Sequence, residues 1–280
     1  MNDQHYQSLP AGWTAEQWKV LTEQLRLTTT PSDDPQHSVS IAQLLDEEGA
    51  LRYVQQLGDI YESEDLPFIT SMLAKRYSYM IVAPALYAMT VFGKGIDVTP
   101  EHCTLESHFK GDIWLPHVRL DKPEPMALHL EPEAGKVLSE QDCGCVDADA
   151  AQRQREQYLA TIFAGHLQPV WNSLARAAGV SRAILWENAA IYVYYVYETL
   201  LADPSHDAYR ERIEADFAYL TEEAPASLFG EKWNPLARFN TPKRLSAGSD
   251  QPKRIRKTCC LYYLSGEDAG YCSVCPKREA

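Results

Sequence analysis

The sequence predicts an α+β fold: a mostly helical body with a small central antiparallel β element and an irregular C-terminal segment. Three observations support this class. Apolar residues recur at helical spacing over much of residues 14–222, and short apolar stretches broken by Gly, Pro and Asp replace that pattern near residues 95–130. After residue 230 the helical periodicity is lost. We therefore expect a helical body over residues 1–230, with a β insert near 95–130, and a tail over residues 231–280 that packs back on the body.

Helices are expected throughout the first hundred residues. Thr14 stands where a helix N-cap is favoured, and the apolar residues behind it lie about one turn apart, which predicts a helix over residues 14–27. A similar stripe predicts a helix over residues 41–61. Residues 67–92 are mostly apolar, which predicts a buried helix that bends or breaks near Pro84.

The second half of the body is predicted to be helical again. Residues 134–149 are polar and rich in turn-forming residues, and we expect a mobile connection there. Helical spacing then resumes, which predicts helices over three ranges: 150–179, 182–201 and 206–222. Residues 229–250 contain Trp-Asn-Pro and Thr-Pro sequences and lack helical spacing, so no helix is expected in them.

The charge distribution excludes some classes of protein. The formal net charge is −13 and the pI is near 5.1, which argues against nucleic-acid binding. Residues 241–280 carry eight basic and four acidic side chains, a local charge of +4, so the rest of the chain carries −17. No apolar run approaches the roughly 20 residues that a transmembrane helix needs. The first residues lack the basic start and apolar core of a secretory signal, so we expect a cytoplasmic protein, with loose association with the inner face of the membrane left open.

The tail contains four cysteines in a C-C-x11-C-x2-C pattern: Cys259, Cys260, Cys272 and Cys275. Four thiolates on one short segment can bind a zinc ion or a 2Fe-2S cluster. The Cys272–Cys275 spacing suits either centre, but adjacent cysteines fit one zinc ion poorly because neighbouring side chains tend to diverge. A centre with two irons relaxes that constraint, so the spacing favours the cluster over zinc. A disulfide is disfavoured in a reducing compartment.

The other three cysteines carry no clear prediction. Cys103 lies near His102 and His108, but no third ligand stands at a chelating spacing, and we expect a structural role. Cys143 and Cys145 lie in a polar loop and are given no function.

The tail resembles a known family. Residues 256–276, with Cys-Cys-Leu-Tyr-Tyr followed by Cys-x-x-Cys-Pro, resemble the C-terminal iron-sulfur motif of the ferric-siderophore reductases typified by FhuF. Residues 182–188 are similar to the Leu-Trp-x-Asn stretch that begins a core helix in that family. Eleven residues separate Cys260 from Cys272 where about ten are expected, and a loop with Gly266 and Gly270 can absorb one residue.

The resemblance implies a siderophore-iron reductase that transfers one electron from a 2Fe-2S cluster, bound by the four tail cysteines, to Fe(III) in a bound siderophore. Fe(II) would then be released in the cytoplasm. Because the sequence has no nucleotide-binding glycine loop, we expect an external electron donor such as a ferredoxin or flavodoxin. The cations Arg256 and Lys257 are placed to tune the cluster or to dock that donor.

The siderophore pocket is predicted on the helix after residue 182. Aromatic rings with a polar end suit a large amphipathic chelate, although core packing is the more frequent explanation for such rings. The candidates are Trp186, Asn188, Tyr192 and Tyr195. Asn188 lies on a mostly apolar helix and must find an internal hydrogen-bond partner. The acidic body favours a neutral or cationic hydroxamate chelate over an anionic catecholate. Three alternatives remain. The first is a zinc-stabilised structural protein, and the second is an iron-sulfur electron carrier or redox sensor without siderophore turnover. The third is a siderophore-handling or biosynthetic enzyme that shares the helical body, although the lack of a nucleotide-binding loop counts against ATP-dependent ligation.

Overall fold

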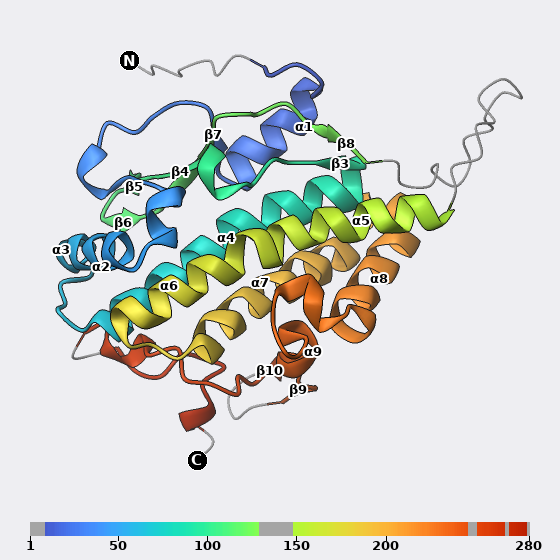
Figure 1. Cartoon of the computed structure of the whole chain (residues 1–280). Coiled ribbons are helices and arrows are strands. Elements are labelled where there is room, and N and C mark those ends of the chain that lie inside the picture. The colour runs from blue at the N-terminus through green and yellow to red at the C-terminus, as the bar shows by residue number, and fades with distance from the viewer. Residues whose placement is uncertain (1–8, 129–147, 246–250, 267–268, 279–280) are drawn as a thin grey trace, which may run out of the picture.

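The computed structural model describes residues 9–128, 148–245, 251–266 and 269–278, and it has the predicted α+β architecture. Two long helices, α4 (Leu66–Phe92) and α7 (Arg182–Ala202), pack against each other through the centre of the molecule (Figure 1). Helices α5 (Ala148–Ile162) and α6 (Gln168–Ala178) lie alongside them. The small strands formed by residues 27–127 lie on one side of this helical layer, and the C-terminal tail lies on the other.

The N-terminal helices are shorter than predicted. Helix α1 (Ala15–Lys19) begins at Thr14, whose hydroxyl accepts a hydrogen bond from the Gln17 amide, and it continues as a π-helical turn over Val20–Gln24. The helix ends at Leu25 because residues 27 and 28 pair with a strand. The range 41–61 contains a 3₁₀ turn (Ile41–Leu45), α2 (Glu47–Gln56) and α3 (Gly58–Tyr61) in place of one helix.

The main sheet combines the predicted insert with strands from the N-terminal part. Its order is β1-β7-β4-β2, with bounds Leu27–Thr28, His117–Leu120, Cys103–Glu106 and Val39–Ser40. The β4–β7 pair within the insert is antiparallel, as expected. The unpredicted strand β2 also pairs antiparallel with β4, whereas β1 runs parallel to β7. Two further antiparallel pairs lie in the insert: β3 (Lys94–Gly95) with β8 (Met126–Ala127), and β5 (Phe109–Lys110) with β6 (Ile113–Trp114).

Helix α4 runs without interruption from Leu66 to Phe92. The Asp65 carboxylate caps it by accepting a hydrogen bond from the Phe68 amide at 2.8 Å, and Gly93 ends it in the left-handed conformation (φ 64°). Pro84 lies inside the helix and does not break it, so of the predicted bend or break the break is wrong. The packing of this buried helix against α7 outweighs the one backbone hydrogen bond that proline removes.

The C-terminal part contains one helix that the sequence did not predict. Helix α8 (Arg210–Ala218) follows a 3₁₀ turn, and α9 (Pro235–Phe239) lies in the range expected to be irregular. The Asn234 side chain caps α9 by accepting hydrogen bonds from two backbone amides, which stabilises a helix too short to show periodicity. The tail continues through the paired strands β9 (Lys243–Arg244) and β10 (Lys253–Arg254). Most of the predicted mobile connection, with Cys143 and Cys145, lies outside the described residues.

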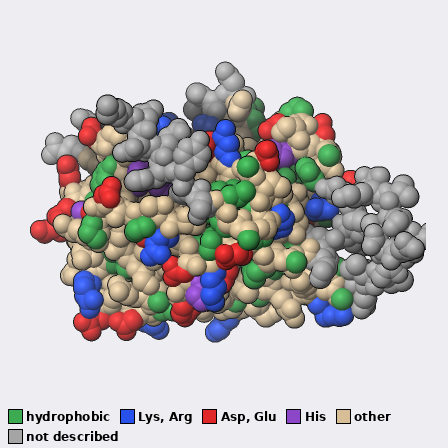
Figure 2. All heavy atoms as spheres, turned by 90° about the horizontal axis from the view of Figure 1, so that it is seen from above, with side chains coloured by type: hydrophobic (Ala, Val, Ile, Leu, Met, Phe, Trp, Pro, Cys, Tyr) green, Lys and Arg blue, Asp and Glu red, His purple; other side chains and the backbone are tan. Residues whose placement is uncertain are grey.

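Seen from above the view of Figure 1, the described side chains form no extended basic face. Figure 2 shows Lys and Arg side chains interspersed with Asp and Glu, and hydrophobic groups as separate small areas. Among the residues that the structure describes, no helix combines the length and the apolar character required to span a membrane.

Candidate iron-sulfur site

Two turns place the tail cysteines. Cys259 and Cys260 precede Leu261, whose left-handed backbone (φ 63°) turns the chain into a short 3₁₀ helix over Tyr262–Leu264. This conformation costs a non-glycine residue about 1 kcal/mol, so surrounding contacts must hold it. Cys272 and Cys275 lie in a second turn, in which the Cys275 amide donates to the Cys272 carbonyl at 3.0 Å. The Arg256 amide donates to the Val274 carbonyl at 3.0 Å and joins the two turns.

The four thiols form two facing pairs. The Sγ atoms of Cys260 and Cys272 are 3.8 Å apart, and the thiol of Cys259 interacts with that of Cys275. Adjacent cysteines therefore belong to different pairs. Two thiolates bound to one tetrahedral metal at about 2.3 Å lie roughly 3.8 Å from each other, so the Cys260–Cys272 spacing suits a shared ion. A 2Fe-2S cluster takes two thiolates on each iron, and this donor set fits it.

The described cysteines are all free thiols. Within the described ranges, no group of three or more Cys, His, Asp or Glu side chains is arranged to hold one metal ion. Cys103 is buried in β4 and belongs to neither pair.

The electrostatic surroundings favour a thiolate at Cys260. A hydrogen bond from the Cys272 thiol, with help from the cations Lys75 and Arg256, lowers the pKa of Cys260 to about 4. The same hydrogen bond raises the pKa of Cys272, because it stabilises the protonated donor. Cys260 and Cys275 are buried, whereas Cys259 and Cys272 are half-exposed. The site thus has an inner, cation-supported side and an outer side.

A buried carboxylate anchors the segment before the cysteines to α7. Glu187 accepts hydrogen bonds from the backbone amides of Lys257 (2.6 Å) and Thr258 (2.8 Å), and one from the Thr258 hydroxyl. Its carboxylate also lies 3.5 Å from Nε of Arg256, and both side chains are almost fully buried. Because two amides and a guanidinium surround it, this carboxylate is satisfied without water.

A second chain of hydrogen bonds joins α4, α7 and the cysteines. The Asn188 amide oxygen accepts from Nη2 of Arg256 at 2.8 Å, and its nitrogen donates to the Ser71 carbonyl at 3.1 Å. The Ser71 hydroxyl donates to the Cys260 carbonyl at 2.8 Å. The predicted internal partner of Asn188 therefore exists, and it consists of the groups that hold the cysteine segment.

The structure separates the four residues predicted for the pocket. Trp186 is fully buried, with its indole N–H donating to Glu231 at 2.9 Å, and Asn188 is 1% exposed. Neither can contact a bound chelate in this structure, so their interpretation changes from pocket to core packing and anchoring. Tyr192 is half-buried and contacts the Tyr79 ring edge-to-face, and Tyr195 is 54% exposed.

The two predicted basic residues lie in different environments. Arg256 is buried against Glu187 and Asn188, so it can tune the centre but has no surface to offer a docking protein. Lys257 is exposed and its ammonium group donates to the Arg238 carbonyl. Glu187, Ser71 and Lys75 were not predicted. The signal for Glu187 was present in the sequence, since Glu187 and Asn188 form a polar pair in the mostly apolar first half of the helix.

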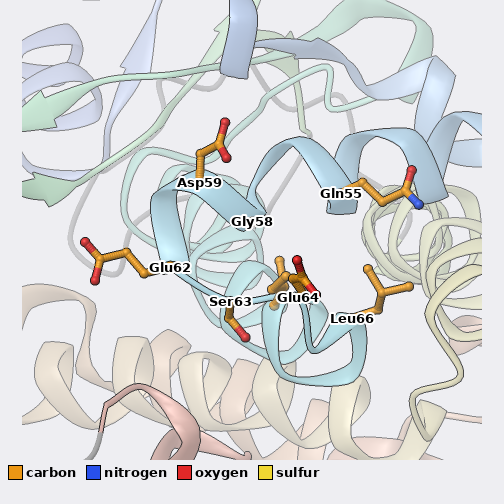
Figure 3. A pocket seen from close by; sticks show the side chains of 8 residues that line it. Gln55, Gly58, Asp59, Glu62, Ser63, Glu64 and Leu66 are labelled. Atoms are coloured by element: carbon orange, nitrogen blue, oxygen red, sulfur yellow. The ribbon is translucent and has the colours of Figure 1, made fainter.

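A surface cavity of about 900 Å³ lies at the start of α4, next to α2 and α3. Its acidic lining residues are Asp59, Glu62 and Glu64 (Figure 3). The carboxylates of Asp59 and Glu62 point in different directions and do not converge on one point. The cavity therefore has the size to hold a small molecule but no focused set of ligands.

These features define a class: a helical protein whose tail presents paired thiols for an iron-sulfur centre. Comparison with protein families agrees. Residues 71–248 match the family described as ferric iron reductase FhuF-like transporter, and residues 256–277 match the FhuF 2Fe-2S C-terminal domain. The chain belongs to this family, and its C-terminal domain indicates a 2Fe-2S cluster. No curated protein matches the chain significantly.

Proposed function

We propose that this protein reduces Fe(III) while the iron is still held by a siderophore, and that Fe(II) then leaves the chelate in the cytoplasm. The family supports a ferric iron reductase role with an iron-sulfur centre. The observation that carries the proposal is the pairing of Cys260 with Cys272 and of Cys259 with Cys275 on a segment anchored to the helical body.

The chemistry requires one electron. Siderophores hold Fe(III) through hard oxygen ligands, and one added electron lowers the charge on the metal and weakens its bonds to them. When bound, a 2Fe-2S cluster supplies electrons singly, which matches the change at the substrate iron. The protein itself needs no nucleophile or general base. Its residues have to position the four thiolates, hold the chelate nearby and exclude unproductive orientations.

Each part of the described site has a task in this proposal. Cys259, Cys260, Cys272 and Cys275 bind the cluster iron, and Glu187 and Asn188 hold the segment that carries them. Buried Arg256 favours a more negative, reduced centre by placing a positive charge beside it. Exposed cations of the tail, including Lys257 and Arg278, offer a docking site for an acidic ferredoxin or flavodoxin.

Cofactor content is the first test. Protein purified without oxygen is analysed for iron, sulfide and zinc, and its visible spectrum is recorded before and after chemical reduction. We expect two irons and two sulfides per chain, by the composition of a 2Fe-2S centre. Cys272→Ser should lose the colour, whereas the matched control Cys103→Ser should keep it, because Cys103 lies in neither pair.

Siderophore reduction is the second test, and it separates a reductase from an electron carrier or redox sensor. The anaerobic protein is reduced, freed of excess reductant and mixed with a ferric siderophore in the presence of a trap for Fe(II). Trapped Fe(II) that is absent with Cys272→Ser supports the proposal. A coloured, reducible protein that leaves every ferric siderophore unchanged contradicts it and assigns the chain to the carrier or sensor class.

A further inference from the structure

Next to the cysteine segment lies a surface that the residues above do not account for. We call it the cation–tyrosine surface, and its members are Arg26, Lys75, Arg76, Tyr79, Tyr192, Tyr195 and Tyr262. The ammonium group of Lys75 lies 5.1 Å from the ring centre of Tyr262, and the guanidinium of Arg26 lies 5.3 Å from that of Tyr79. The rings of Tyr79 and Tyr192 are 5.5 Å apart, which links α4 to α7.

The three cations of this surface lack an acidic partner among the described residues. In the part of the chain that the structure describes, no carboxylate lies within ion-pair distance of Arg26, Lys75 or Arg76. Other arginines near the tail are paired, as Arg256 is with Glu187 and Arg254 with Glu198. An unpaired group of half-buried cations stands out in a chain with a net charge of −13.

The arginines are held in place before any ligand arrives. Nε of Arg76 donates to the Trp114 carbonyl at 2.9 Å, and its guanidinium lies over the Tyr61 and Trp114 rings. Arg26 has a left-handed backbone (φ 60°), which is strained for a residue other than glycine. Such strain persists only where surrounding structure fixes it, and it clusters at ligand clamps. These side chains therefore lose little freedom on binding an anion.

The surface is continuous with the cysteine segment. Tyr262 follows Cys260 by two residues and lies against Lys75, which is one helical turn after Ser71. The Ser71 hydroxyl donates to the Cys260 carbonyl, so this turn of α4 is in direct contact with the segment. Tyr192 stands one turn after Asn188 on the same face of α7. A chelate bound to these groups would lie beside the centre that has to reduce its iron.

Charge and ring chemistry together select a ligand class. A ferric tris-catecholate is a multiply charged anion with flat aromatic ligands, so it gains from arginines, a lysine and tyrosine rings. A ferric tris-hydroxamate is neutral and gains little from unpaired cations. Resting on the proposed reductase function, we infer that the cation–tyrosine surface binds ferric siderophores of net negative charge, of the catecholate type. The overall acidity of the chain predicted the opposite preference, but the local surface has the reverse sign.

Two other occupants fit less well. The acidic cavity at Asp59, Glu62 and Glu64 would repel an anionic chelate and attract a cationic one, so it provides the competing binding site. An acidic electron-donor protein is better served by the exposed tail cations, since long exposed side chains steer protein encounters. Half-buried arginines fixed against aromatic rings suit a compact ligand.

The test measures binding without electron transfer. Ga(III) has the charge and nearly the size of Fe(III) but is not reduced under these conditions, so calorimetric titration with Ga(III) chelates reports affinity alone. Holoprotein is titrated with Ga(III) tris-catecholate and Ga(III) tris-hydroxamate at low and high salt. The variants are Arg26→Gln and Lys75→Gln, because neither side chain donates a hydrogen bond to another described residue, and the matched control is exposed Arg52→Gln on α2.

We expect the catecholate complex to bind at least about tenfold more tightly than the hydroxamate, with salt weakening only the former. Arg26→Gln and Lys75→Gln should each weaken catecholate binding about fivefold or more, and Arg52→Gln should leave it unchanged.

Three results would overturn the inference. The first is equal or tighter binding of the hydroxamate complex, above all if Asp59→Asn weakens it. The second is catecholate binding that both surface variants leave unchanged. The third is that both surface variants bind the chelate normally but accept electrons from an acidic ferredoxin more slowly than the wild type. That result would show that the surface binds the electron donor. If Ga(III) catecholate binds as expected but no ferric siderophore is reduced, the reductase proposal fails and the binding surface stands.

Discussion

Glu187→Gln tests whether the buried carboxylate on α7 holds the cysteine segment in place. The substitution keeps the size of the side chain and removes its charge. In the wild type the carboxylate accepts from two backbone amides, at 2.6 and 2.8 Å, and faces Arg256 at 3.5 Å. In the variant, one acceptor oxygen is replaced by an NH₂ group that points at donors, and the buried guanidinium loses its counter-charge.

The expected cost follows from burial. The side chains of Glu187 and Arg256 are 2% and 3% exposed, so water cannot replace the lost charge interaction between them. Removing one partner of a buried pair costs about 3–5 kcal/mol. A free-energy change of about 1.4 kcal/mol alters an equilibrium constant tenfold. The population of the detached form of the segment should therefore rise about a hundredfold or more. Cluster release passes through detachment, so its rate should rise by a similar factor.

The assay follows the visible absorption of anaerobic holoprotein in the presence of a strong iron chelator. The matched control is Glu198→Gln. Glu198 lies on the same helix and also binds the tail, through ion pairs with Lys243 and Arg254. Glu198 is 30% exposed, so its loss should cost no more than about 1 kcal/mol. Cluster release from Glu187→Gln at the rate of the wild type, or at the rate of Glu198→Gln, would refute the anchoring role.

The remaining predictions concern stability. Burial lowers the pKa of His166 to about 4, below its ordinary value of about 6.5, so the folded state disfavours the protonated ring and stability is lost as the pH falls through 6.5. Relative to His166→Gln, the wild type should lose about 2 kcal/mol of unfolding free energy between pH 7 and pH 5. Parallel plots of unfolding free energy against pH for the two proteins would contradict this. Asn188→Ala should lower the unfolding free energy by about 1–3 kcal/mol and speed cluster release, because Arg256 and the Ser71 carbonyl lose their partner; an unchanged thermal transition would count against it. Gly49→Ala should cost more than about 2 kcal/mol in denaturant unfolding, because the new Cβ would lie 2.2 Å from the Gln43 carbonyl oxygen. In Gly179→Ala the new Cβ meets no other atom and only the left-handed backbone (φ 65°) is strained, so the unfolding free energy should fall by about 1 kcal/mol. Equal losses in the Gly49 and Gly179 variants would be inconsistent with the structure.

Local patterns predicted the long elements of this fold. Helices α4 and α7 carry enough apolar residues at regular spacing to be identified from sequence alone. The strands of the main sheet are only two to four residues long, and β1 and β2 join it from distant parts of the chain. No window of sequence contains that pairing, because it depends on where the helices bring the strands. The uninterrupted path of α4 through Pro84 is likewise decided by packing against α7.

The candidate site likewise has a part that local sequence predicts and a part that depends on distant contacts. The cysteines were predictable because their spacing is a local property of one segment. The groups that hold them come from α4 and α7, more than sixty residues away in sequence, as in the contacts of Glu187 with Thr258 and of Ser71 with Cys260. Asn188 was correctly expected to have an internal partner, but the sequence did not reveal that the partner is Arg256. Overall charge says little about the surface beside the cysteines, since it averages over distant acidic residues.

The most direct test of the central claim is a single-turnover experiment. Holoprotein is reduced by one electron per chain, freed of reductant and mixed without oxygen with one equivalent of ferric siderophore and an Fe(II) trap. Rapid-mixing spectroscopy follows the visible absorption of the protein and the trapped Fe(II) together. We expect the protein to be reoxidised at the rate at which Fe(II) appears, with about one Fe(II) for each electron supplied. A protein that stays reduced while the ferric chelate stays intact would contradict the claim that this tail is the centre of a siderophore-iron reductase.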